Sequence, residues 1–176
     1  MSRKLLRKLL QEKLVLVFLD RGFEQLSLPS RERKSREMSS AFPLGRLVRP
    51  SKGVFDLVNV QIHSRRAAFV LNFGIADPEK TMHPWGQFRG RDTMVSDLAT
   101  QCRLYSSRTF MIWFGESWFT FGSGLESHLE TAIDRAIDYC SEVESYFSTE
   151  IVGPHVKCIL YSGDASAGIR ATVKHT

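Results

Sequence analysis

A row of carboxylates in the last third of the chain is the pattern that most directly suggests a chemistry. Five acidic residues recur at intervals of four positions: Glu126, Glu130, Asp134, Asp138 and Glu142. In an α-helix this spacing places them along one stripe, where like charges at i, i+4 repel one another. Such a face is suited to docking a basic protein partner and to steering it electrostatically. The alternative is a solvated face, or one neutralised by the basic N-terminal segment.

A second candidate site lies on the polar face of the stretch 54–76, which alternates apolar and polar positions. Asn59, Gln61 and His63 share one strand face, and we expect Asn72 opposite them. Trp85, in the loop that follows, would fold over this face. Convergent amides on a sheet are suited to binding a small ligand. The other interpretation is that they are half-solvated, or hydrogen-bond to loops that cover them.

The sequence lacks the usual motifs of catalysis and metal binding. Its five histidines show no HxxxH or HExxH spacing, and it has no GxSxG, P-loop or strand-associated GxGxxG motif. We therefore expect no catalytic residue, no metal and no cofactor, and favour a protein that is not an enzyme. A cysteine nucleophile with a distant histidine stays open, although a buried thiol is the better interpretation.

The cysteines give an expectation about the cellular compartment. Cys102, Cys140 and Cys158 are widely spaced, odd in number and form no CxxC pair. We expect three reduced thiols in a reducing compartment.

Hydrophobic periodicity predicts the elements that position these groups. An i, i+3, i+4 pattern predicts a helix over 3–19, ended near Gly22, and a second helix over 125–147. Between them we expect a central hairpin over 54–76 and a second hairpin over 103–122. A short strand over 42–48 would lie at a sheet edge because it contains Pro43. The polar segments 27–40 and 77–99 predict loops.

These elements predict an α+β fold with an antiparallel sheet of about four to six strands, flanked by an N-terminal and a C-terminal helix. We expect one domain over residues 1–153 and a C-terminal extension over 154–176 that packs on the same domain as β-strand. In the central hairpin, the alternation predicts one buried and one solvated face. Hydrophobic residues make up 43% of the chain, which is enough for a core.

The net charge of +5 is unevenly distributed. Residues 1–37 contain ten Lys/Arg and five Asp/Glu, whereas residues 125–150 contain seven acids and one base, Arg135. The basic N-terminal helix, with Arg3, Lys4, Arg7 and Lys8, suggests nucleic acid, but no nucleic-acid-binding motif accompanies it. We therefore expect a basic protein as partner rather than nucleic acid. The oligomeric state is left open.

The apolar segments are too short for a membrane span or a signal peptide. Glu12 and Lys13 interrupt the N-terminal apolar run. We expect a cytoplasmic protein with no membrane partner, with an amphipathic membrane-surface helix as the alternative.

Several short motifs resemble a mostly bacterial family of small uncharacterised proteins, domain of unknown function 4304. The matching segments are Gly22–Phe23 at the end of the first helix, the strand pair Val58–Gln61 and Phe69–Ile75, Arg103, and Trp118–Phe119. The resemblance covers roughly residues 5–147. It implies an α+β fold and no established activity. By analogy with small bacterial families of this type, it also suggests an immunity or antitoxin-like protein.

Overall fold

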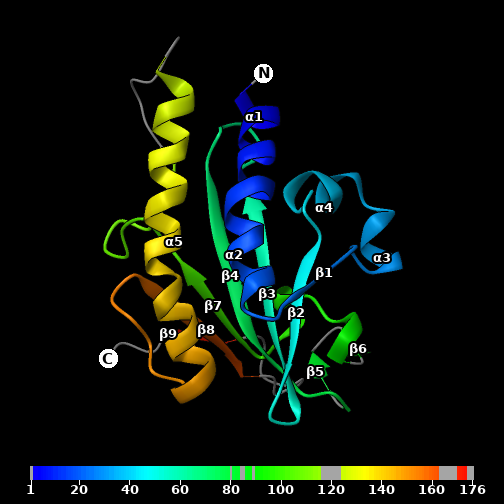
Figure 1. Cartoon of the computed structure of the whole chain (residues 1–176). Helices are drawn as coiled ribbons and strands as arrows, with labels where there is room; N and C mark the ends of the chain where they lie inside the picture. Colours follow the sequence, from blue (N-terminus) through cyan, green and yellow to red (C-terminus); the bar gives the residue numbers. More distant parts are fainter. Residues whose placement is uncertain are drawn as a thin grey trace.

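Two helical elements lie side by side on one face of an antiparallel sheet (Figure 1). The structure is a computed structural model, and it describes residues 2–79, 81–83, 86–88, 90–115, 124–162 and 170–173. The N-terminal helical element comprises α1 (Ser2–Leu9), the π-helical segment η1 (Leu10–Leu14) and α2 (Val15–Asp20). The C-terminal helix is α5 (Leu125–Thr149). The predicted α+β class and both helices are confirmed.

The sheet has the strand order β1-β2-β3-β4-β7-β8-β9 in the described part of the chain, with every neighbouring pair antiparallel. Its strands are β1 (Glu24–Leu26), β2 (Arg46–Ser51), β3 (Val54–Ile62), β4 (Phe69–Ala76), β7 (Thr100–Leu104), β8 (Val156–Ser162) and β9 (Arg170–Val173). Short β1 adds an edge that the sequence pattern does not indicate. The segment after residue 153 contributes β8 and β9 to this same sheet. A separate ribbon pairs β5 (Thr81–His83) with β6 (Gly86–Phe88).

The main core lies between the sheet and the two helical elements. The central hairpin β3–β4 forms as predicted, with Asn59 opposite Asn72. Its helix-facing side chains join those of the helices in one buried cluster, which includes Val58, Val60, Phe69, Leu71, Phe73, Leu10, Leu14, Phe18, Leu129 and Ile133. These are the positions that the two periodicities predict, because both patterns mark the same buried layer.

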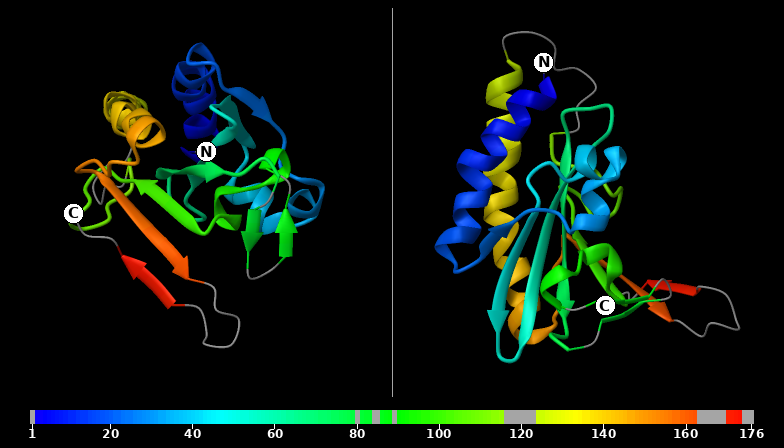
Figure 2. Two further views of the ribbon diagram at one scale, coloured as in Figure 1. Left: turned by 90° about the horizontal axis from the view of Figure 1, so that it is seen from below. Right: turned by 90° about the vertical axis from the view of Figure 1, so that its right-hand side faces the viewer.

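The second face of the central hairpin is also buried, so the expectation of a solvated face is wrong. A segment after β6 crosses it, containing the short 3-10 helices η2 (Gly90–Asp92) and η3 (Val95–Asp97). Val95 and Leu98 pack there against Leu57 and Ala76. Leu98 approaches β4 so closely that a Cβ at Gly74 would lie 2.5 Å from its Cδ1. Figure 2 shows this side of the sheet opposite α1–α2 and α5.

Two predictions near the N-terminus are wrong. The segment predicted as a loop over 27–40 contains the short helices α3 (Ser30–Arg33) and α4 (Arg36–Ala41), and Ser35 caps α4 by accepting a hydrogen bond from the Met38 backbone N–H. The first predicted strand begins only at Arg46 and pairs on both sides, with β1 and β3, rather than lying at an edge. Pro43 precedes this strand, so it does not restrict the pairing.

The second predicted hairpin is wrong in its described part. After β7 the chain makes a tight turn, closed by a bridge between Ser107 and Ile112, and Met111 has a positive φ of 51°. Phe114 then bridges to Phe69. Residues 116–122 lie outside the described residues.

The prediction of three reduced thiols is also wrong. Cys102 on β7 and Cys158 on β8 are direct cross-strand partners and form a disulfide. Cys140 is free and buried on α5, and burial raises the pKa of its thiol to about 12. A thiol with this pKa supplies almost no thiolate near neutral pH, which argues against a cysteine nucleophile.

The disulfide removes the basis for expecting a reducing compartment. The cytoplasmic location therefore stays a prediction without support from the cysteines. In the described part of the chain, no helix combines the length and apolar character needed to cross a bilayer.

Candidate functional site

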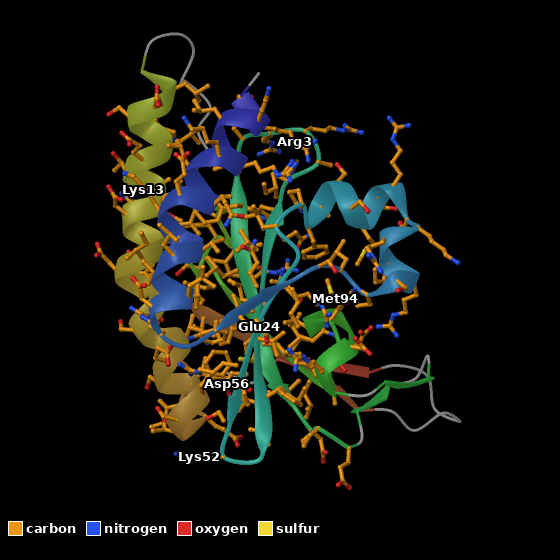
Figure 3. The ribbon with its side chains drawn as sticks, turned by 45° about the vertical axis from the view of Figure 1, so that its right-hand side comes forward. Arg3, Lys13, Glu24, Lys52, Asp56 and Met94 are labelled. Atoms are coloured by element: carbon orange, nitrogen blue, oxygen red, sulfur yellow. A yellow bond between two sulfur atoms is a disulfide. The ribbon has the colours of Figure 1, made fainter. Side chains whose placement is uncertain are left out.

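The middle of the predicted acidic row faces a lysine of the N-terminal helical element. Lys13 Nζ lies 3.1 Å from Glu130 Oε1 and 3.6 Å from Asp134 Oδ1. The hydrogen bond that Lys13 donates to Glu130, with a further contribution from the charge of Asp134, raises the pKa of Lys13 above its ordinary value. Figure 3 shows Lys13 beside α5. The alternative of neutralisation by the basic N-terminal segment therefore holds for Glu130 and Asp134, and among the described residues Lys13 is the cation that provides it.

Glu142 has a different environment from the rest of the row. Its Oε2 accepts a hydrogen bond from the His155 backbone N–H at 2.9 Å, and its Oε1 lies 2.6 Å from His155 Nδ1. The His155 ring stacks on Tyr139 with centroids 3.7 Å apart. The carboxylate also occupies the space that a side chain at Gly153 would need. Glu142 thus joins α5 to the start of β8 and does not offer its carboxylate to a partner.

The Glu142–His155 pair has the geometry that orients a general base, because a carboxylate holds one ring nitrogen. Among the described residues, however, this ring forms no hydrogen bond with a hydroxyl or thiol group. The arrangement therefore supports a structural role.

Three other members of the row remain exposed. Glu126 and Asp138 are exposed and form no ion pair with any described residue, and the Asp134 side chain keeps 61% of its surface exposed despite Lys13. Arg135 projects from another side of α5, where its Nη1 lies 3.4 Å from Ser106 Oγ. The structure therefore leaves four carboxylates, from Glu126 to Asp138, on the outer side of α5. We call these four residues the acidic face.

The predicted amide site on the hairpin is divided between two roles. Asn59 is 2% exposed, and its Oδ1 accepts a hydrogen bond of 2.9 Å from the Val95 backbone N–H. Asn59 thus fits the alternative interpretation given above, in which a strand amide hydrogen-bonds to a segment that covers the sheet. Asn59 is therefore unavailable to a ligand.

We expect Asn59→Leu to lower the free energy of unfolding by about 1–3 kcal/mol, because it leaves the Val95 N–H buried without an acceptor. Urea unfolding would measure this loss. Gln61→Leu is the matched control, because Gln61 is only partly buried and water can reach its hydrogen-bond partners. Equal losses in the two variants would contradict this role of Asn59.

Gln61 and Asn72 form a network with Arg103, a residue that sequence reasoning did not place on this face. Asn72 Nδ2 donates to Gln61 Oε1 at 3.2 Å, and Arg103 donates from Nε to Asn72 Oδ1 at 2.6 Å and from Nη2 to Gln61 Oε1 at 3.2 Å. The sequence could have indicated this position, because Arg103 lies between the apolar residues Cys102 and Leu104 on β7 and therefore points to the opposite face of the sheet. These groups satisfy one another, which leaves little capacity for a ligand.

His63 stands apart from the amides, at the hairpin turn. Its Nδ1 accepts hydrogen bonds from the backbone N–H groups of Arg65 and Arg66, at 3.1 and 3.2 Å. Partial burial, together with the charges of Arg66, Arg3 and Arg65, lowers the pKa of His63. Trp85, which we expected to fold over the amide face, lies outside the described residues.

A buried ionic cluster lies near the turn between β2 and β3, and it was not predicted from the sequence. Asp56 is fully buried on the helix-facing side of β3, opposite Arg49 on β2. Arg49 Nη2 lies 2.8 Å from Asp56 Oδ2 and 2.9 Å from Glu144 Oε2, and its guanidinium covers the Phe23 ring. The sequence contains an indication of this cluster: Asp56 precedes Val58 by two positions, so the alternation places this acid on the buried face of the strand. This cluster fastens α5 to the sheet rather than forming an open site.

An open groove of about 380 Å³ lies between β1 and α4. Its polar lining groups already have partners: Gln25 bonds Gln11 and the Leu44 carbonyl, and Arg33 bonds Ser30. The groove therefore lacks the free convergent groups of a ligand site. In the described residues no cluster of three or more His, Cys, Asp or Glu side chains is arranged to bind a metal.

Comparison with protein-family models, curated proteins and solved structures finds no match for this chain. The resemblance based on short motifs stays an expectation.

Proposed function

We propose that the protein is a non-enzymatic binding module whose acidic face on α5 docks a basic surface of another protein. One observation carries this proposal: of the charges on the outer side of α5, only those facing Lys13 are neutralised within the described structure. Arg135, the single base in the segment 125–150, points toward Ser106 instead.

The position of α5 supports this proposal. The helix lies at the outside of the molecule, with α1–α2 along one flank (Figure 1). Leu16, one helical turn after Lys13, is 48% exposed, which is unusual for a leucine on a helix that otherwise buries its apolar residues. In the proposed complex, Leu16 would add an apolar contact to the charged ones, since interfaces combine an apolar core with a polar rim. The charges would act mainly on encounter rate and specificity.

The alternative, a small-ligand or enzymatic site on the polar face of the hairpin, has less support. Asn59 holds the covering segment, and Gln61 and Asn72 bond each other and Arg103. We therefore place the binding function on α5.

Charge reversal at Asp134 and Asp138 tests the proposal. We expect Asp134→Lys/Asp138→Lys to weaken partner binding on the order of tenfold or more, because two attractive rim charges become repulsive. Proteins would be captured at low salt from the host extract, and each one retained would then be purified. Its dissociation constant would be measured against increasing salt, with a steep weakening expected.

A control of equal charge separates position from net charge. Glu37→Lys/Glu79→Lys makes the same change in total charge, at exposed sites on α4 and after β4. The partner should bind this control and the wild type alike. A protein that binds all three forms equally would exclude the acidic face as its docking site, and an empty capture would count against a binding module.

A further inference from the structure

A small cavity lies on another side of α5, between the first turns of this helix and the segment that follows β7. Its volume is about 100 Å³. The described residues that line it are Ser106, Trp113, Gly115, His128, Thr131, Ala132 and Arg135. This lining contains a guanidinium, an imidazole and two hydroxyls, and no carboxylate. It was not predicted from the sequence.

His128 carries an unsatisfied polar atom in this lining. Its Nε2 is buried and has no hydrogen-bond partner. Buried polar atoms normally have a hydrogen-bond partner, so a buried atom without one next to a cavity indicates that the partner is a molecule bound in the cavity. In the tautomer that carries its proton on Nε2, His128 donates a hydrogen bond and would be satisfied by an oxygen acceptor in the cavity.

Arg135 supplies the charge that favours an anionic acceptor. Its Nη1 lies 3.4 Å from Ser106 Oγ, a long and weak contact that leaves the other guanidinium donors available. A guanidinium matches the two oxygens of a carboxylate or phosphate group with parallel hydrogen bonds. Ser106 and Thr131 add hydroxyl groups to the same lining.

Basic residues lie behind one wall of the cavity. Trp113, one of its walls, contacts the His63 ring edge-to-face at 5.2 Å. Around His63 lie Arg66, Arg3 and Arg65, whose positive charges act together on this ring. His128 also lies in the first turns of a 25-residue helix, whose N-terminal end carries partial positive charge.

From this geometry we propose that the cavity between α5 and the segment after β7 binds one small oxyanion, a carboxylate or a phosphate-type group, through Arg135 and His128. The size fits this class, since a water molecule takes about 30 Å³ of liquid volume and a space a few times larger holds one such anion. The site is distinct from the acidic face, because Arg135 and Asp134 project from different sides of α5.

The test is an NMR titration of the full-length protein. Resonances of the Arg135 guanidinium and the His128 imidazole would be followed while sodium phosphate or sodium acetate is added, with sodium chloride at equal ionic strength as reference. We expect saturable shifts at both residues with at least one oxyanion and none with chloride. If only acetate gives saturable shifts, the anion that the cavity binds is a carboxylate. If only phosphate does, the cavity binds a tetrahedral anion.

Two variants and one control complete the experiment. Arg135→Gln and His128→Leu should each weaken anion binding on the order of tenfold or more. Arg36→Gln removes the same charge from an exposed site on α4 and should bind as the wild type does. Because Arg135 is exposed, we expect its variant to stay folded even if the His128 variant does not. Linear shifts without saturation, or equal binding by Arg135→Gln and Arg36→Gln, would overturn the proposal.

Discussion

Arg49→Met is expected to lower the free energy of unfolding by about 3–5 kcal/mol, as measured by urea unfolding. The reason is the fully buried Asp56, whose Oδ2 accepts hydrogen bonds from Arg49 Nε at 3.0 Å and Nη2 at 2.8 Å. Its Oδ1 has no partner in the described structure. Without Arg49, Asp56 would be a buried charge with no compensation, and Glu144 would lose its closest cation.

The decrease in the free energy of unfolding caused by Arg49→Met should depend on pH in a defined direction. Burial raises the pKa of Asp56 in the folded protein above its ordinary value. The folded state therefore keeps this proton more tightly than the unfolded state, so stability falls as pH rises from the ordinary carboxyl range through the folded pKa. Removal of Arg49 takes away the positive charge beside Asp56, so it raises the pKa of Asp56 in the folded protein further. The pH range over which stability falls then extends to higher pH. The difference between wild type and Arg49→Met should thus be larger near about pH 7 than near about pH 4.

A second substitution distinguishes the lost charge pair from a general packing defect. In Arg49→Met/Asp56→Leu the uncompensated carboxylate is gone, and apolar groups of similar size take the place of the pair. Such replacements are often neutral or stabilising, so the double variant should regain most of the loss. A double variant as unstable as Arg49→Met, or a loss independent of pH, would show that the buried carboxylate is not the cause.

Removal of the disulfide is the second change with a large expected effect. Cys102→Ala/Cys158→Ala is expected to cost about 4 kcal/mol, because the bridge closes a loop with a sequence separation of 56 residues. The bridge also ties β8, which follows α5, to β7 within the sheet. Urea unfolding of the oxidised wild type and of the variant would measure the difference.

Reduction provides the control for this experiment. The free energy of unfolding of the wild type should fall toward that of the variant when a strong reductant is present during unfolding, and the variant itself should not respond. Cys140 is already a free thiol, so it contributes nothing to this response. An oxidised wild type no more stable than the variant would contradict a stabilising bridge.

The local elements of this protein follow from short-range patterns. The i, i+4 spacing of Leu6, Leu10 and Leu14 predicts the N-terminal helical element, and Gly22, with a φ of 83°, ends it as expected. The alternation over 54–76 predicts the central hairpin and the opposition of Asn59 and Asn72. Such patterns can be recognised because the period of each element is a property of its own backbone.

The roles of the polar side chains could not be predicted in this way. The acidic row was visible at intervals of four, yet its members differ: Glu130 contacts Lys13, Glu142 holds His155, and Asp138 stays exposed. The same spacing thus leads to an ion pair, a strand anchor and a free carboxylate. Each outcome depends on the segment packed against that part of α5.

The sequence by itself thus determined the α+β class, the two long helices, the central hairpin and the uneven distribution of charge. The tertiary structure decided the burial of Asn59 under Val95, the Cys102–Cys158 pairing and the Arg49–Glu144 contact between residues 95 positions apart. The physical reason is that periodicity is a local property of the chain. Hydrogen-bond partners, sheet register and burial arise from contacts between distant segments, which no local pattern records.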